Sequence, residues 1–173
     1  MAYLKMAAGD RTRKLFLEIM NRPNRYIARD ALTQTTISFS ALRDFYKDKD
    51  WMCDRITTLE THLRILSTLA PYAAVNFIRK GMGYEQYLIE YAQYRKIRPE
   101  ELLEVLDRIQ ESAKGMKNLE EWENYIEDYT KKLAEQAKKQ ETKREGIVIS
   151  TLHAVKGLEY DNCLLYTSPS PRD

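Results

Sequence analysis

Apolar residues recur at helical spacing through the middle of this 173-residue chain, and the pattern points to an architecture of packed helices. The clearest stripe follows Asp50, which can cap the N-terminus of a helix. The apolar positions step by four and three, so they share one face; they are Met52, Ile56, Leu59, Leu63 and Leu66. We therefore predict a mainly α fold with this face in the core.

Prolines and glycines divide the next part of the chain into successive helices. Pro71 suits the first turn of a helix, and Gly81 with Gly83 interrupts it before a further helical segment, Tyr84–Tyr94. Pro99 opens another helix. The apolar stripe expected on that helix is Leu102, Leu106, Ile109 and Ala113.

The last helical pattern begins with a capping box, in which Asn118 and Glu121 satisfy free backbone groups at a helix N-terminus. Its expected apolar stripe is Trp122, Ile126, Tyr129 and Leu133. The charged residues 138–145 then form a helix end or a linker. They lead to a short β-type run, Ile147–Ser150.

The chain contains 12 tyrosines, whose aromatic faces are able to stack on the bases of single-stranded nucleic acid. Tyr84, Tyr87, Tyr91 and Tyr94 step by three, four and three along one helix face. This spacing favours a packing stripe over a base-stacking surface.

The β-type run continues into a polar strand-to-loop segment, Thr-Leu-His-Ala-Val-Lys-Gly-Leu-Glu-Tyr, at residues 151–160. Side chains alternate along a strand, so Thr151 and His153 face one side and Leu152 faces the other, towards a core. Two hydrogen-bonding side chains therefore lie along one groove. Such an edge is suited to a nucleic acid backbone.

The loop half of this segment adds charge and backbone freedom. Lys156 supplies a flexible cation for phosphate or carboxylate, and Gly157 permits a turn with positive φ and a close backbone approach. Glu159 accepts hydrogen bonds when ionised, which suits a ribose hydroxyl. A lone histidine or lysine is more often an ordinary solvated side chain. Five specified residue types at fixed spacing are a more specific signal than a lone histidine or lysine.

Residues 151–160 resemble motif V of the UvrD/Rep/PcrA-type DNA helicases, whose consensus reads Thr-x-His-x-x-Lys-Gly-Leu-Glu followed by an aromatic residue. In that family the motif lies in the second RecA-like domain. The resemblance implies that Thr151 and His153 contact single-stranded DNA and that Glu159 contacts the nucleotide ribose. Lys156 and Gly157 shape the loop between them, with Lys156 on the DNA side and Gly157 on the nucleotide side.

The N-terminal part resembles the same family. Residues 2–7 and 16–27 are similar to the segment where these helicases enter their inserted 2B subdomain, although Ala28 stands where relatives often carry glycine. The resemblance implies a helical subdomain inserted in a RecA-like α/β (P-loop NTPase) domain, of which only short pieces are present. Residues 1–20 and 144–162 are the expected RecA-like pieces, and residues 21–143 are the expected 2B-type insert.

Residues 163–173 depart from the family pattern. Their sequence, Cys-Leu-Leu-Tyr-Thr-Ser-Pro-Ser-Pro-Arg-Asp, resembles the translation of a sequencing-library adapter, so we expect a non-native tail. The alternative is a genuine Ser/Pro-rich tail.

Charge is distributed unevenly along the chain. Basic residues outnumber acidic ones by seven to three in residues 1–30, whereas acidic residues outnumber basic ones by ten to three in residues 99–128. DNA attracts the first segment and repels the second. Arg22, Arg25 and Arg29 are therefore candidate phosphate contacts. A solvated or salt-bridged turn explains these arginines equally well.

The composition, with 43% hydrophobic and 31% charged residues, is typical of a globular protein. No apolar run approaches the roughly 20 residues of a membrane span, and no signal peptide is expected. Cys53 and Cys163 provide neither a disulfide framework nor a metal site, so the expected location is the cytoplasm. His62 and His153 are too far apart in sequence to suggest zinc.

These residues contain no Gly-x-x-x-x-Gly-Lys-[Ser/Thr] phosphate loop. The family resemblance implies that the intact parent binds ATP and Mg²⁺, translocates 3′ to 5′ along single-stranded DNA and unwinds duplex DNA. Because the phosphate loop is missing from these residues, the parent must supply it from another part of its chain. We expect this fragment alone to be inactive, with no catalytic residue and no bound cofactor or metal. The alternative from another class is a non-catalytic helical module that binds DNA or a protein.

Overall fold

The computed structural model of the chain describes residues 1–142, 149–151, 155–156, 159–160 and 162–165. The chain divides into two compact units, Met1–Tyr129 and Thr130–Asp173. These units are features of the fold, and the domain boundaries suggested by the sequence stay predictions.

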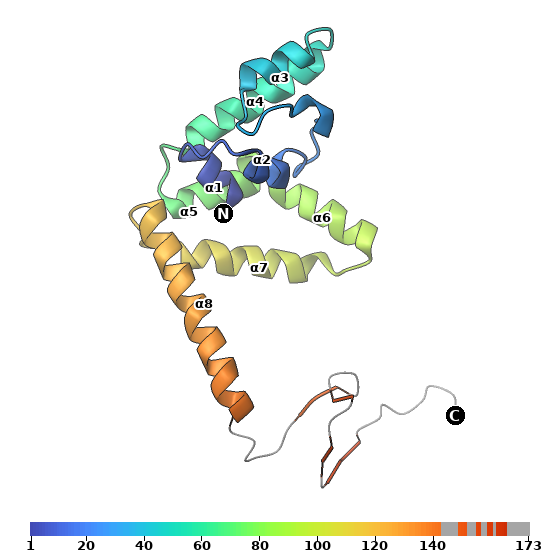
Figure 1. Cartoon of the computed structure of the whole chain (residues 1–173), viewed down its shortest axis with the longest axis vertical. Coiled ribbons are helices and arrows are strands. Elements are labelled where there is room, and N and C mark those ends of the chain that lie inside the picture. Colours follow the sequence, from blue (N-terminus) through green and yellow to red (C-terminus); the bar gives the residue numbers. More distant parts are fainter. Residues whose placement is uncertain (143–148, 152–154, 157–158, 161, 166–173) are drawn as a thin grey trace, which may run out of the picture. The chain divides into compact units, whose positions relative to one another are not determined.

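The described residues form a succession of helices (Figure 1), which confirms the mainly α prediction. The RecA-like α/β surroundings stay a prediction. Extended pairing among these residues is limited to an isolated antiparallel bridge between Thr12 and Thr36. The helical elements are α1 (Ala2–Ala7), α2 (Arg13–Ile19), the 3₁₀ helix η1 (Arg29–Ala31), α3 (Phe39–Phe45), α4 (Asp50–Leu66), α5 (Pro71–Asn76), the π-helix η2 (Phe77–Gly81), α6 (Tyr84–Arg95), α7 (Pro99–Ser112) and α8 (Leu119–Thr142).

Helix α4 is the centre of the core of the first unit. All five residues of its predicted stripe are buried, which confirms that prediction; they are Met52, Ile56, Leu59, Leu63 and Leu66. Met6 of α1 and Phe16 of α2 are fully buried in the same cluster. Burial of each large apolar side chain contributes about 1.5–3 kcal/mol, so this stripe contributes substantially to the stability of the unit.

The cap predicted for α4 is wrong by one residue. Lys49 occupies the N-cap position, and Asp50 is the first helical residue. Its carboxylate lies in the first turn, where a negative charge is favoured by the helix dipole. Asp50 therefore suits this terminus through its charge rather than through a side-chain cap.

Pro71 occupies the first turn of α5, and Pro99 occupies the first turn of α7, as predicted. Between them, η2 ends at Gly81, where an added Cβ would come within 2.7 Å of the Phe77 ring. Gly83 then adopts a φ of +72°, which places it in the left-handed region at the N-cap of α6.

Arg79 of η2 joins α6 and α7. Its side chain is only 11% exposed and forms ion pairs with Glu85 at 2.9 Å and Asp107 at 2.8 Å. It also donates a 2.6 Å hydrogen bond to the amide oxygen of Gln110. Hydrogen bonds from Lys80 and Arg79 lower the pKa of Glu85, which keeps this carboxylate ionised.

This network corrects the predicted stripe of α7. Ile109 is 42% exposed, whereas its neighbour Gln110 is only 8% exposed. The bond to Arg79 accounts for the exchange, because a buried guanidinium needs acceptors that isoleucine lacks. Ala113, at the end of the same stripe, is fully buried as predicted.

The start of α8 agrees with its predicted cap. The backbone N–H of Glu121 donates to the Asn118 side chain at 2.8 Å, although the Glu121 carboxylate accepts from the Lys117 N–H and leaves the box incomplete. Trp122 is 1% exposed, as predicted. Tyr129 and Leu133 are 55% and 49% exposed, so the prediction of a continuous buried stripe is wrong beyond the first turns.

The tyrosine stripe of α6 packs at one end only. Tyr84 contacts the ring of Tyr3 edge-on, and Tyr87 stacks on Tyr91 with ring centroids 6.3 Å apart. Tyr94 is 83% exposed, so the packing prediction does not hold for it.

No helix in the described part of the chain is long and apolar enough to span a bilayer.

Candidate nucleic-acid interface

The loop formed by residues 21–28 connects α2 to η1 and carries two of the three candidate arginines. Asn21 closes this loop like a clamp. Its side-chain amide donates to the Ile27 carbonyl at 2.9 Å, and its oxygen accepts from the Ile27 N–H at the same distance. The same oxygen accepts from the N–H of Arg25 at 3.4 Å. A single asparagine thus replaces the backbone pairing that an irregular loop lacks.

Arg25 points inward and is only 9% exposed. Its guanidinium donates to the carbonyls of Ile19 at 3.0 Å and Pro23 at 3.1 Å, with a longer contact to Met20 at 3.5 Å. It also donates to the Tyr3 hydroxyl at 2.9 Å. These contacts satisfy carbonyls at the C-terminal end of α2, which the helix itself leaves unpaired.

This placement corrects the view of Arg25 as a phosphate contact. Its Nη1 donates to backbone carbonyls and its Nη2 donates to the Tyr3 hydroxyl, and the side chain is buried against the loop that it supports. Arg25 is therefore a structural residue in this chain.

Tyr3 of α1 connects the loop to the core. Its hydroxyl donates to the carbonyl of Arg22 and lies under the guanidinium of Arg25. Burial raises the pKa of Tyr3, and the Arg25 charge partly opposes this shift. The Tyr46 hydroxyl accepts a 2.7 Å hydrogen bond from the Ala28 N–H and fixes the other end of the loop.

Arg22 and Arg29 point outward. Both residues are exposed, Arg22 within the clamped loop and Arg29 at the start of η1. A rigid backbone with exposed guanidinium groups is a suitable arrangement for phosphate contacts, because the backbone is already ordered before binding. These two arginines remain candidates.

A surface pocket of about 240 Å³ lies between this loop and α4. Its lining residues are Pro23, Asn24, Arg25, Arg55, Thr58, His62 and Met82. His62 packs edge-on against the Phe77 ring, with centroids 5.4 Å apart. Burial lowers the pKa of His62, and the Arg25 charge lowers it further, so the imidazole is neutral near pH 7.

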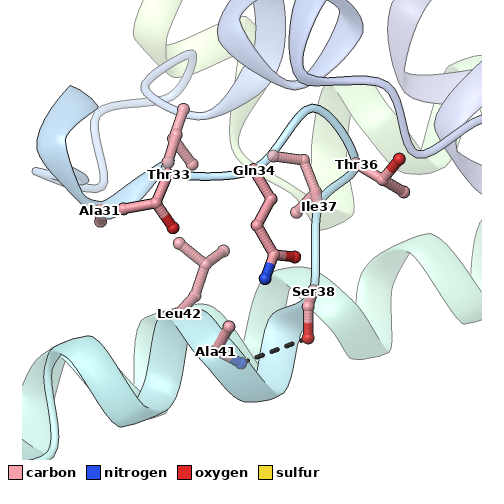
Figure 2. A pocket seen from close by; sticks show the side chains of 9 residues that line it. Ala31, Thr33, Gln34, Thr36, Ile37, Ser38, Ala41 and Leu42 are labelled. Atoms are coloured by element: carbon pink, nitrogen blue, oxygen red, sulfur yellow. Dashed lines mark hydrogen bonds between the residues drawn. The ribbon is translucent and has the colours of Figure 1, made fainter.

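A second hollow lies where the chain enters α3 (Figure 2). Figure 2 shows the Gln34 side chain pointing into it and the Ser38 hydroxyl accepting from the Ala41 N–H, which caps α3. Its volume of about 10 Å³ has room for roughly one water molecule. This hollow is therefore too small for a nucleotide or a base.

The segment from residue 151 to 160 is described only in part. Thr151, Lys156 and Glu159 are exposed, and the Val155 N–H donates to the Thr151 carbonyl at 3.3 Å in a turn. His153 and Gly157 lie outside the described residues, as does half of the predicted strand Ile147–Ser150. Ile149, one of the two described residues of that run, is 94% exposed.

The structure therefore brings Arg22, Arg25 and Arg29 into one region and turns one of them inward. The DNA and nucleotide roles of Thr151, His153, Lys156, Gly157 and Glu159 stay predictions. The model for the UvrD-like helicase C-terminal domain matches residues 1–170. The chain belongs to this family. No curated protein and no solved structure matches the chain.

Membership in the UvrD-like helicase C-terminal family gives the two polar regions a common, helicase-related context. The residues that sequence reasoning missed are those that build the loop: Tyr3, Asn21 and Tyr46. Asn21 carried a general signal, because asparagine favours turns and its side chain hydrogen-bonds nearby backbone groups. The two tyrosines act across distances in sequence that no local pattern reveals.

Proposed function

We propose that this chain is part of an ATP-dependent DNA helicase that moves 3′ to 5′ along single-stranded DNA and unwinds duplexes. The observation that carries the proposal is the family match over residues 1–170. The complete polar pattern at residues 151–160 supports it. In the intact protein, ATP and Mg²⁺ supply the driving force, and the site that holds them is built mainly by residues outside this chain.

The proposal divides the work between two regions. Arg22, exposed within the clamped loop, and Arg29, exposed at the start of η1, bind backbone phosphates. Thr151, His153 and Lys156 contact the single strand. Gly157 and Glu159 lie towards the nucleotide. One short segment therefore couples the state of the bound nucleotide to the affinity for DNA. The expected location is the cytoplasm.

The acidic helix α7 carries charge that DNA repels. Ion-paired carboxylates on it stay largely exposed, including Glu104 at 68% and Asp107 at 62%. Arg108, on the same helix, is 81% exposed and lies 3.8 Å from Glu104. Under this proposal α7 does not contact the DNA track, which makes Arg108 a matched control for the arginines of the loop.

Fluorescence anisotropy with labelled single-stranded, duplex and forked oligonucleotides tests the proposal on the full 173-residue chain. We expect binding at low salt that weakens as salt rises, because released counterions drive phosphate contacts. Arg22→Ala and Arg29→Ala should each weaken binding to all sequences and lower the magnitude of the salt slope by about 1. Arg108→Ala should change neither quantity.

An absence of DNA binding at low salt would contradict the proposal. Equal effects of Arg22→Ala and Arg108→Ala would contradict the role given to the loop. A separate assay follows phosphate release with ATP, Mg²⁺ and single-stranded DNA. We expect no turnover by this chain alone, and turnover that survives purification would overturn that expectation.

A further inference from the structure

Three exposed side chains form a stack on the surface of the first unit. The guanidinium carbon of Arg55 lies 5.1 Å from the centroid of the Tyr26 ring and 4.9 Å from that of the Trp51 ring. Tyr26 is 62% exposed and Trp51 is 51% exposed. We call these three residues the aromatic ladder. The arrangement holds two large π-faces at the surface, where core packing does not explain them.

Helix α4 fixes one side of the ladder. Trp51 and Arg55 are four residues apart, so they lie on one face, while Met52 and Ile56 face the core. Because the buried stripe anchors α4 along its whole length, the rotation of the helix is set. Trp51 and Arg55 are therefore held outward by the same packing that stabilises the unit.

The clamped loop fixes the other side. Tyr26 has a φ of +61°, in the left-handed region that side-chain-bearing residues rarely adopt. The Asn24 side chain accepts from the Tyr26 N–H at 3.2 Å, and Asn21 holds Ile27, the next residue. Such a backbone costs on the order of 1 kcal/mol and persists because its surroundings impose it. The loop therefore holds an unfavourable conformation that directs an aromatic ring to the surface.

The two carboxylates beside the ladder favour recognition of bases over phosphates. Asp50 and Asp54 are exposed on the same helix and flank Trp51 and Arg55 in sequence. Among the described residues, no ion pair joins Arg55 to a carboxylate, and its guanidinium stacks on rings instead. Neighbouring carboxylates repel a phosphate chain, whereas a neutral base that stacks on an aromatic face is insensitive to them.

The 240 Å³ pocket adjoins the ladder and shares Arg55 with it. Thr58 and His62 continue along α4 from Arg55 and line the pocket. Its volume is below the roughly 300–1,000 Å³ of typical small-molecule sites. A pocket of this size suits one unit of a polymer that continues over the neighbouring surface.

We propose that the aromatic ladder, with the adjoining pocket, is a stacking site for unpaired nucleic-acid bases. The ladder receives bases released at a single-strand to duplex junction, and Arg55 holds the two rings at a fixed separation. This inference rests on the proposed DNA-handling function and adds a base-recognition site to it. The site differs from Arg22 and Arg29, which bind phosphates whether or not bases are present.

The experiment uses the full chain and three labelled duplexes of equal length. One has a blunt end, one has a single-stranded overhang with bases, and one has an overhang of abasic nucleotides. The abasic overhang keeps the phosphates and removes the π-faces. We expect tighter binding to the overhang with bases than to the abasic overhang, by about five- to 150-fold for each stacked base.

Three variants test the ladder. Trp51→Ala removes one ring, and Arg55→Lys keeps the charge but loses the planar group. Tyr26→Gly removes the other ring with a residue that tolerates positive φ, so the loop keeps its conformation. Each variant should reduce the preference for bases and leave the salt slope unchanged. Tyr94→Ala, at an 83% exposed tyrosine on α6, is the control and should leave the preference intact.

Circular dichroism of every variant tests whether it is folded. If Trp51→Ala is unstable, Tyr26→Gly still tests the ladder. Equal binding of the wild-type chain to both overhangs would overturn the base-stacking site while leaving the proposed function in place. Equal loss of affinity for both overhangs in the ladder variants would also overturn it. An absence of binding to all three duplexes would overturn both proposals.

Discussion

The loop at residues 21–28 and the segment at residues 151–160 contain the candidate DNA contacts, yet the chain builds them differently. In the loop, Asn21 and Arg25 bind backbone groups on both sides of the turn, and Tyr3 and Tyr46 connect it to helices. In the other segment, Lys156 and Glu159 are exposed, and the backbone bond from Val155 to Thr151 closes a single turn.

The difference shows what each kind of site requires. An irregular loop is organised when its own side chains satisfy its backbone, and residues 21–28 provide those side chains. A strand-to-loop motif takes its geometry from neighbouring strands, because a strand's N–H and C=O groups point sideways. The described residues contain no sheet that offers such neighbours. The conformation of the loop is therefore fixed by its own side chains, whereas the conformation expected for the motif requires neighbouring strands.

The largest effect is expected from Arg25→Met. This change leaves several buried carbonyls and the Tyr3 hydroxyl without their donor, so the free energy of unfolding should fall by about 3 kcal/mol. The urea midpoint at unchanged slope measures it. Arg22→Ala, at an exposed position, should stay within about 0.5 kcal/mol of wild type. Similar losses from both variants would show that Arg25 does not organise the loop.

Asn21→Ala should have the next largest effect. Two well-formed hydrogen bonds to the Ile27 backbone are lost, so we expect a decrease of about 1–2 kcal/mol in the free energy of unfolding. Asn24→Ala removes one exposed bond, to the Tyr26 N–H, and should cost about 0.5 kcal/mol. A larger loss of stability from Asn24→Ala than from Asn21→Ala in urea denaturation would show that Asn21 is not the residue that closes the loop.

A smaller effect is expected from a change of pH, through His62 of α4. Burial and Arg25 lower the pKa of His62, so the folded state binds this proton less readily than the unfolded state. The stability contribution is therefore complete above the ordinary histidine pKa of about 6.5 and is lost as pH falls below it. His62→Phe should flatten the stability profile between pH 7 and 5. An unchanged profile would assign the pH dependence to other groups.

The smallest effects on stability are expected in the motif segment. Lys156→Ala and Glu159→Gln alter exposed side chains, so each should change the free energy of unfolding by less than about 0.5 kcal/mol. Under the proposed function, Lys156→Ala weakens DNA binding and lowers the salt slope by about 1, whereas Glu159→Gln does not. A large loss of stability from either variant would show that this segment is packed as firmly as the loop.

Local patterns predicted the regular parts of the fold. The stripe of α4 was predictable because every apolar residue obeys the helical period and nothing polar competes for the core. Pro71 and Pro99 were informative because proline fits the first turn of a helix and little else in it. The Asn118 cap was predictable because its partner Glu121 is only three residues away.

Predictions failed where a distant partner decides the outcome. Gln110 displaces Ile109 from the interior because Arg79, 31 residues earlier, needs its amide oxygen. Arg25 turns inward because the end of α2 presents unpaired carbonyls. Tyr129 continues the apolar pattern of α8 but is 55% exposed, since a pattern does not show where a helix leaves the core. The candidate site depends on such distant partners more than the core does.

The burial of Trp122 and the exposure of Trp51 have a spectroscopic consequence. These are the two tryptophans of the chain, and they are 1% and 51% exposed. A dissolved quencher such as acrylamide reaches an exposed indole far more readily than an enclosed one. Intrinsic emission therefore contains two separable components without any added dye. The quenchable component reports on the surface of α4, and the protected one reports on the packing of α8.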